Sequence, residues 1–223
     1  MKKIFTSTLF LLPFCILSAQ SLRIEYEVQF KSMNSGDIKG SEEFKKKVAE
    51  VQNKPQKHLL TYSDGNSVYE SFPHPEIYDI NVGDPFEGTK SHSNSYKIDA
   101  IKLFKIKEKN GAYAYRNVKN EKYYEYAAPV FNTIKMLDSS DTILSYHCKI
   151  LEVELTNKKI AKVWYTEELP MKTGPLSYYQ FPGVVLKVET DYMTVIPKSI
   201  DKNTSNIELE KMDKNLEIID KTL

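Results

Sequence analysis

The amino-acid sequence predicts a mainly β protein, built as a curved antiparallel sheet or half-barrel with one or two flanking helices. Three observations support this fold class. Apolar and polar residues alternate without a break from 22 to 31, which is the period of a strand with one buried face. Prolines and glycines interrupt the segment from 163 to 190, where the chain must turn between strands. Two further strand-like segments change phase midway, which indicates bulged and therefore curved strands.

Residues 1–19 have the order of a secretory signal peptide: two lysines, an apolar run from 4 to 16, and small residues up to Ala19. We therefore expect cleavage near Ala19/Gln20 and export to the periplasm or the extracellular space. The apolar run is shorter than the ~20 residues that span a bilayer, so no transmembrane anchor is expected. The remaining chain, 20–223, contains no repeat and no Gly/Ser-rich linker, and it predicts a single β-rich domain.

The first half of the chain contains one helical segment among strands. Residues 41–53 predict a helix, because Ser41 can cap the first turn and apolar residues recur on one face. Residues 57–72 predict a hairpin, because an Asp-Gly-Asn turn that tolerates positive φ separates two strand-like halves. Prolines interrupt the stretch from 72 to 95, which is expected to be irregular.

Most of the remaining chain has the alternation or the composition of strands. The predicted strands are 96–106, 111–118, 122–126, 146–155, 159–166 and 184–190. In 96–106 and 146–155 the apolar positions switch parity, and a bulge in each strand would keep both sets of side chains facing one core. Residues 207–220 predict a second helix from their apolar spacing, although Ile207 and Leu209 also fit the start of a strand.

Charge and cysteine content exclude several classes of partner and cofactor. The chain has 31 Lys and Arg against 30 Asp and Glu, a net charge of +1, so no nucleic-acid partner is expected. Only Cys148 remains after removal of the leader, and the mature chain can form no internal disulfide. The four histidines lie far apart without the spacing of zinc ligands, and neither a metal site nor a cofactor is predicted.

The segment from 163 to 190 places proline and glycine wherever a strand must end. The prolines fix φ at three corners, and two glycines permit backbone angles that are closed to other residues. These residues are Pro170, Gly174, Pro175, Pro182 and Gly183. We interpret the segment as a bend in a β scaffold, without chemistry of its own.

Residues 143–190 also carry short motifs in a fixed order. They are Tyr146-His147-Cys148-Lys149, Trp164-Tyr165-Thr166, Leu169-Pro170, Gly174-Pro175, and Pro182-Gly183 followed by aliphatic residues. This order resembles the signature region of the GLPGLI family of secreted bacterial proteins, although Gln180 stands where the family's first glycine would be. The resemblance implies an exported, mainly β protein, and no established activity comes with it. It gives structural roles to Cys148, Trp164, Tyr165, Pro170, Gly174, Pro175, Pro182 and Gly183.

The chain is more loosely similar to the bowl-shaped accessory domain in front of some bacterial peptide N-glycosidases. That similarity implies a carbohydrate-related function. No Gly-x-Ser-x-Gly, Walker or Rossmann motif occurs in the sequence, and its many acidic residues are scattered without a clear pair. We therefore predict no catalytic residue.

Two groups of side chains are candidates for a site. Cys148 follows His147, but neighbouring residues on a strand point to opposite faces, so we interpret Cys148 as a buried structural thiol. Tyrosine has an apolar face and a polar tip, which suits sugars, peptides and amphipathic ligands on a concave sheet. Strands also favour tyrosine for packing, and Trp164 also fits a core anchor. The predicted ligand-binding residues are Tyr113, Tyr115, Tyr124, Tyr126, Trp164, Tyr178 and Tyr179.

The sequence thus predicts an exported protein that binds a small molecule, glycan, peptide or lipid on a concave sheet face and does not catalyse a reaction. A hydrolase acting on envelope sugars or peptides is the alternative. A polar cleft with two convergent carboxylates, or an exposed Cys148 beside a histidine, would favour that alternative. A structural component of a cell-envelope complex is the third hypothesis.

Overall fold

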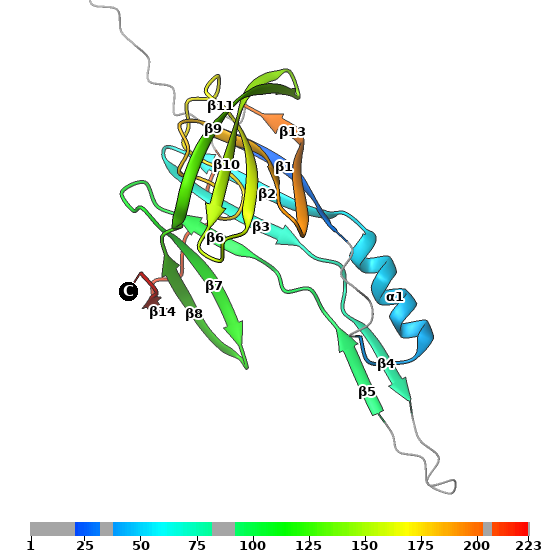
Figure 1. Ribbon diagram of the computed structural model, residues 1–223. Helices are drawn as coiled ribbons and strands as arrows, with labels where there is room; N and C mark the ends of the chain where they lie inside the picture. Colours follow the sequence, from blue (N-terminus) through cyan, green and yellow to red (C-terminus); the bar gives the residue numbers. More distant parts are fainter. Residues whose placement is uncertain (1–20, 32–37, 82–91, 203–206, 223) are drawn as a thin grey trace, which may run out of the picture.

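The computed structural model describes residues 21–31, 38–81, 92–202 and 207–222 (Figure 1). Among these residues lie one helix and fourteen strands. In chain order they are β1 (Ser21–Phe30), α1 (Glu42–Asn53), β2 (Gln56–Ser63), β3 (Asn66–Phe72), β4 (Ile77–Asn81), β5 (His92–Tyr96), β6 (Lys102–Lys105), β7 (Ala112–Val118), β8 (Glu121–Ala127), β9 (Phe131–Ile143), β10 (Tyr146–Leu155), β11 (Ile160–Thr166), β12 (Val184–Glu189), β13 (Met193–Asp201) and β14 (Glu217–Asp220).

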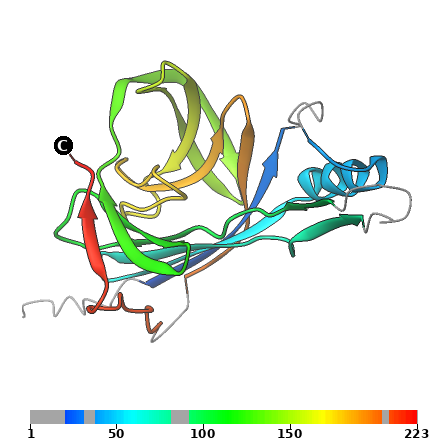
Figure 2. The same cartoon turned by 90° about the horizontal axis from the view of Figure 1, so that it is seen from below.

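Twelve of these strands form a single sheet in the order β14-β8-β7-β6-β3-β2-β1-β13-β12-β11-β10-β9. Among the described strands, neighbours are antiparallel except β14 and β8, which run parallel. β4 and β5 form a separate hairpin, which extends to one side together with α1 as an arm (Figure 1). Seen from below, the large sheet curves into an open bowl (Figure 2). The predicted mainly β fold with a curved sheet and a flanking helix is confirmed.

Local sequence explains both α1 and the β2–β3 hairpin. The Ser41 hydroxyl caps α1 by accepting a hydrogen bond from the Phe44 amide at 3.2 Å. Phe44 and Val48 are the buried residues of the helix, which packs on β1 and β4. At the hairpin, Asp64 and Gly65 have φ values of 46° and 86°, as the tight turn between twisted strands requires. Both elements confirm the predictions.

One of the two predicted bulges is present. In β10 the register with β9 shifts between Lys149 and Leu151, so that both apolar sets of this strand are buried. The other predicted strand, 96–106, is broken instead of bulged. β5 ends at Tyr96 and β6 begins at Lys102, and the chain between them leaves the sheet. Because of this break, β6 pairs with only the first part of β7, and the rest of β7 has no partner among the described strands on that side.

Two other predictions of secondary structure are wrong. The supposedly irregular stretch from 72 to 95 contains β4 and β5, which pair with each other. The helix predicted for 207–220 is not formed, because the chain runs without regular structure to Leu216 and then joins the sheet as β14. The predicted leader, 1–19, lies outside the described residues. No described helix is long and apolar enough to cross a membrane.

The main hydrophobic core lies inside the curve formed by β1–β3 and β10–β13. The segment 167–183, which connects β11 to β12, folds back into this curve (Figure 2). Its side chains Met171, Tyr178 and Phe181 are therefore buried inside the bowl. A smaller cluster on β3, β6 and β8 is covered by apolar side chains of 207–216. The two ends of the sheet thus differ in how they are covered.

Candidate functional site

The aromatic residues predicted to bind a ligand do not form one exposed face. Four of them are buried, with at most 6% of each residue exposed: Tyr124, Trp164, Tyr178 and Tyr179. Tyr113, Tyr115 and Tyr126 are half-buried on β7 and β8. The rings of Tyr113 and Tyr126 lie 4.8 Å apart, and those of Tyr115 and Tyr124 lie 5.9 Å apart. Most of this aromatic surface therefore packs within the protein.

The concave face at β10–β12 is filled by the chain itself. The Phe181 ring stacks on Phe131 and Tyr165, with centroid distances of 5.7 and 6.4 Å. The Thr173 carbonyl accepts a hydrogen bond from the Val185 amide at 2.9 Å, which ties the segment to β12. A ligand on this part of the sheet would have to displace these groups.

Two glycines of this segment are required for space and not for unusual backbone angles. A Cβ at Gly174 would lie 2.1 Å from the Tyr178 carbonyl oxygen, and a Cβ at Gly183 would lie 2.0 Å from the Thr166 carbonyl oxygen. Neither glycine has a positive φ. The backbone angles that only glycine permits are therefore not adopted at these two positions. The corner prolines of the same connection between β11 and β12 are Pro170, Pro175 and Pro182.

Cys148 is fully buried in the main core, whereas His147 is exposed. Burial raises the pKa of the Cys148 thiol to about 11. The thiol therefore stays protonated near neutral pH and is a poor nucleophile. This geometry favours a structural role over a Cys-His nucleophile. Within the described ranges, no three His, Cys, Asp or Glu side chains gather as metal ligands.

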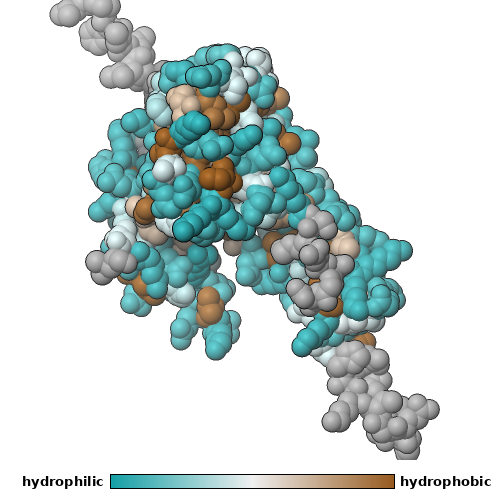
Figure 3. Space-filling view, viewed as in Figure 1, coloured by the Kyte–Doolittle hydropathy of each residue, from teal (hydrophilic) through white to brown (hydrophobic). Residues whose placement is uncertain are grey.

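A large open cleft lies where the sheet is broken between β6 and β7. β6 pairs with β7 only as far as Leu103 and Ala114, although β7 continues to Val118. The chain leading into β6 instead follows β3, and the Ser71 amide donates to the Ile101 carbonyl at 2.9 Å. The cleft has a volume of about 860 Å³, within the ~300–1,000 Å³ of typical ligand sites. In the space-filling view, the surface is indented between β7–β8 and the arm (Figure 3).

Ionisable side chains line this cleft, and their charges nearly balance. Arg116 Nε donates to Glu125 Oε2 at 2.6 Å, between β7 and β8. On the other wall, Lys102 Nζ lies 3.9 Å from Glu70 Oε2 and also pairs with Glu210. The charged residues of the lining are Glu70, Glu76, Asp99 and Glu125 against Lys97, Lys102 and Arg116. The cleft therefore has no strong preference for a cation or an anion.

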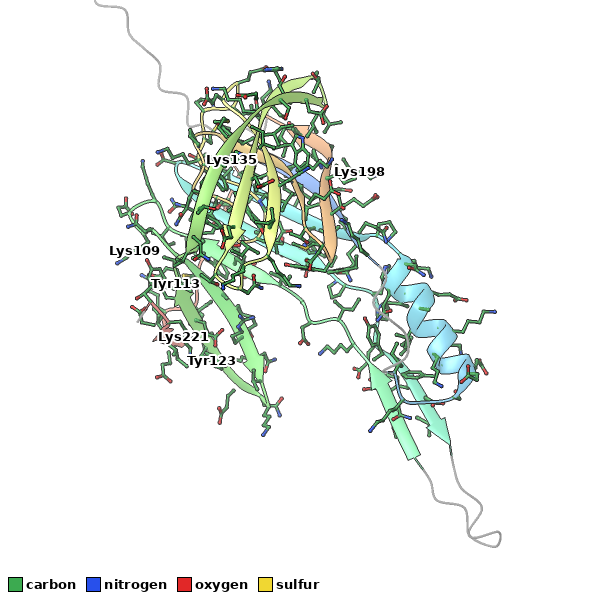
Figure 4. The ribbon with its side chains drawn as sticks, in the orientation of Figure 1. Lys109, Tyr113, Tyr123, Lys135, Lys198 and Lys221 are labelled. Atoms are coloured by element: carbon green, nitrogen blue, oxygen red, sulfur yellow. The ribbon has the colours of Figure 1, made fainter. Side chains whose placement is uncertain are left out.

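The rest of the lining is neutral, and it includes apolar side chains such as Ile98, Ile101 and Val118 as well as polar groups. Tyr115 and Tyr123 are half-buried, and Asn117 is exposed on β7. On the opposite wall, His74 Nε2 is buried and has no hydrogen-bond partner among the described residues. Figure 4 shows Tyr123 on the β7–β8 hairpin, far from Lys135 on β9. Phenol rings, an amide and an imidazole suit an uncharged polar ligand.

Tyr115 is the predicted ligand-binding residue that lines this cleft, whereas Arg116, Asn117 and Glu125 are not predicted from the sequence. The alternation in β7 and β8 is visible in the sequence, but the cleft results from the early end of β6, which is a long-range feature. The local signal is the phase change within 96–106, which we interpreted as a bulge. In the structure it marks the point where the chain leaves the sheet.

Comparison with known proteins supports the looser of the two resemblances seen in the sequence. Residues 130–222, less than half of the chain, match the family model described as "N-glycanase peptide, N-terminal domain". The matched part includes β9–β14. It does not include the cleft residues of β7 and β8. No curated protein matches the sequence.

Solved structures extend the likeness to most of the chain. PNGF-II in space group C2 has a TM-score of 0.53 with 17% identity, over 92% of this chain. PNGF-II in space group P21 has the same TM-score with 18% identity, also over 92% of this chain. This chain spans 31% and 32% of those two structures, about a third of PNGF-II. It therefore shares a fold with part of PNGF-II, and its residues 130–222 resemble the N-terminal domain of an N-glycanase.

Proposed function

We propose that this chain is an exported, non-catalytic binding protein whose ligand occupies the cleft between β6 and β7. The cleft carries the proposal, because it is open, about 860 Å³ in volume and lined by both polar and apolar groups. Its nearly balanced charges favour an uncharged polar chain over nucleic acid. Similarity to the N-terminal domain of an N-glycanase supports a ligand from a glycoprotein, either the glycan or the polypeptide that carries it.

Binding explains the cleft better than hydrolysis does. A glycosidase of the common type uses two carboxyl groups, one of them protonated so that it can act as the acid. Of the four carboxylates in the lining, Glu125 is engaged by Arg116 at 2.6 Å, and Glu70 is paired with Lys102 at 3.9 Å. Side-chain hydrogen bonds lower the pKa of Glu76, which also favours its ionised form. Cys148, the other candidate for catalysis, is buried in a different part of the molecule.

A lipid on the concave face is less well supported, because the segment 167–183 occupies that face with its own side chains. Export is supported by the signal-like order of residues 1–19. It is also supported by the resemblance of residues 143–190 to the GLPGLI family of secreted proteins. A glycoprotein ligand is consistent with that location.

A denatured and alkylated N-glycoprotein tests the proposal, presented with its glycans and again after their enzymatic removal. The mature protein should bind at least one form in biolayer interferometry. Tyr123→Ala and Arg116→Ala should weaken that binding at least about tenfold, or ~1.4 kcal/mol, because both side chains line the cleft. Lys135→Ala is the matched control, since Lys135 is exposed on β9 (Figure 4). Unchanged binding by both cleft variants would refute this location of the site.

A further inference from the structure

The β7 strand has a free edge along the cleft. Its register with β6 ends at Ala114, whereas its register with β8 continues through Val118 and Glu121. The last four residues of β7 therefore have a partner strand on one side only. Free strand edges are the sites at which another extended chain can join a sheet.

The orientation of the backbone groups on this edge follows from the neighbouring ladders. The Lys221 amide donates to the Tyr126 carbonyl at 2.8 Å, so the backbone of Tyr126 faces β14. Tyr126 is opposite Tyr113, whose backbone groups must then face away from β8 and toward β6. Because this orientation alternates along a strand, the N–H and C=O groups of Tyr115 and Asn117 face the cleft. They make no backbone hydrogen bond to another described residue.

The opposite wall also presents a strand edge. Ile101 uses both of its backbone groups toward β3, since its amide donates to Ser71 Oγ at 2.7 Å and its carbonyl accepts from the Ser71 amide. By the same alternation, the backbone of Lys102 faces the cleft. Lys102 and Tyr115 would be the next pair in the β6–β7 register, but they are not paired. The cleft is thus a gap in a ladder of backbone hydrogen bonds.

We propose that an extended polypeptide segment enters this cleft and pairs with β7 as an added strand. This inference rests on the proposed function and names its ligand class. The N–H and C=O groups of Tyr115 and Asn117 exchange hydrogen bonds with the added segment. Only another extended peptide backbone has donors and acceptors at the spacing of these groups. The balanced charges of the lining select a segment without strong net charge.

Two substitutions at Asn117 separate its backbone from its side chain. Asn117→Pro removes an N–H that faces the cleft and leaves the β7–β8 ladder intact, because that ladder uses the backbones of Ala114, Arg116 and Val118. Asn117→Ala retains the N–H. With the denatured, alkylated and deglycosylated protein as the probe, Asn117→Pro should bind at least about tenfold more weakly, and Asn117→Ala within about threefold of the original chain. Equal binding by the two variants would overturn the inference.

If circular dichroism shows that Asn117→Pro is unfolded, amide hydrogen exchange measured by NMR on the original chain tests the inference instead. The original chain is mixed with a short synthetic peptide rich in Thr, Val and Ser, at about millimolar concentration. Exchange at Tyr115 and Asn117 should slow at least about tenfold, since both amides gain an acceptor. Exchange at Arg116, whose amide already faces β8, should change little. Unchanged exchange at Tyr115 and Asn117 would overturn the inference.

The glycosylated probe distinguishes failure of this inference from failure of the proposed function. Binding that requires the glycans, is lost in Tyr123→Ala and survives in Asn117→Pro would place a glycan in the cleft and overturn strand addition. Binding to either probe that is unaffected by every cleft variant would overturn both proposals.

Discussion

The two ends of the twelve-stranded sheet differ in what lies inside the curve of the sheet. At β10–β13, the connection 167–183 folds into the curve and buries Met171, Tyr178 and Phe181. At β6–β8, the ladder is interrupted beyond Ala114, and an open cleft of about 860 Å³ remains. The comparison shows that concavity alone does not make a binding site. Where the segment 167–183 folds into the curve the bowl is a core, and an open cleft remains where a strand partner is missing.

The largest effect is expected from Phe181→Ala, which removes the central ring of the segment 167–183, here called the insert. Phe181 is 3% exposed and stacks on two other rings, so its loss leaves a cavity in the main core. We expect the free energy of unfolding to fall by about 3–5 kcal/mol. Urea denaturation measures this loss. Phe72→Ala is the control, because Phe72 is 47% exposed, and its effect should stay below about 1 kcal/mol. Similar losses for the two variants would contradict the filled-bowl description.

Gly183→Ala tests whether the insert depends on close backbone contact. The added Cβ would lie 2.0 Å from the Thr166 carbonyl oxygen, so the turn before β12 must shift. The expected loss is about 3 kcal/mol, at the upper end of the cost of overpacking. It is read as a lower denaturation midpoint with an unchanged slope. Lys172→Ala, at an exposed position of the same segment, should cost less than about 0.5 kcal/mol. A loss for Gly183→Ala as small as that of the control would show that the turn can move freely.

Short-range features of the fold are predictable from the sequence. The alternation of 22–31 becomes β1, the Ser41 cap begins α1, and Asp64 and Gly65 form the hairpin turn. Each of these depends on residues that are close together in the chain. The bulge in β10 is also predictable, because its phase change lies within one strand.

Long-range pairing decides the elements that the sequence does not reveal. β9 lacks continuous alternation and is a strand because it pairs with β10 across a register shift. β13 contains Pro197, which argues against a central strand, yet Pro197 sits opposite Tyr26 at a bulge in the ladder with β1. The cleft has the same origin, since nothing local in 111–118 shows that β6 will end early. Pairing between distant segments therefore determines the cleft as well as the strands β9 and β13.

Acid should weaken the packing near the centre of the sheet through His58, which lies on β2. His58 is 1% exposed, its Nδ1 lies 2.7 Å from Tyr69 Oη, and burial lowers its pKa to about 4. In the unfolded chain the pKa is near 6.5, so the unfolded state takes up the proton first as the pH falls. The stabilisation is complete above pH ~6.5 and is lost progressively down to pH ~4, by about 3 kcal/mol.

His58→Gln separates this term from the titration of carboxylates. Glutamine can still hydrogen-bond to Tyr69 but does not titrate, so the variant should lose about 3 kcal/mol less than the original chain between pH 7 and pH 4. Urea denaturation at each pH gives both curves. Parallel curves would show that His58 can become protonated without disturbing the core.

The smallest effect is expected at the smaller hydrophobic cluster on β3, β6 and β8, which the segment 207–216 covers. The Tyr124 hydroxyl accepts a hydrogen bond from the Asp213 amide at 3.0 Å. Tyr124→Phe keeps the ring and removes this acceptor, at a cost of about 1 kcal/mol. We expect about fivefold faster amide exchange at Asp213, measured by NMR. Tyr113→Phe is the control, because the same change on the neighbouring strand leaves the Asp213 contact in place.

If exchange at Asp213 is unchanged in Tyr124→Phe, the segment is held by the packing of Leu209, Met212 and Leu216 alone. It would then resemble the insert of the filled half, in which buried side chains carry the attachment. If exchange accelerates as expected, one hydrogen bond contributes a large share of a weak attachment. The end of the sheet at β6–β8 would then be less tightly covered than the end at β10–β13, both in the cleft and where the segment 207–216 packs.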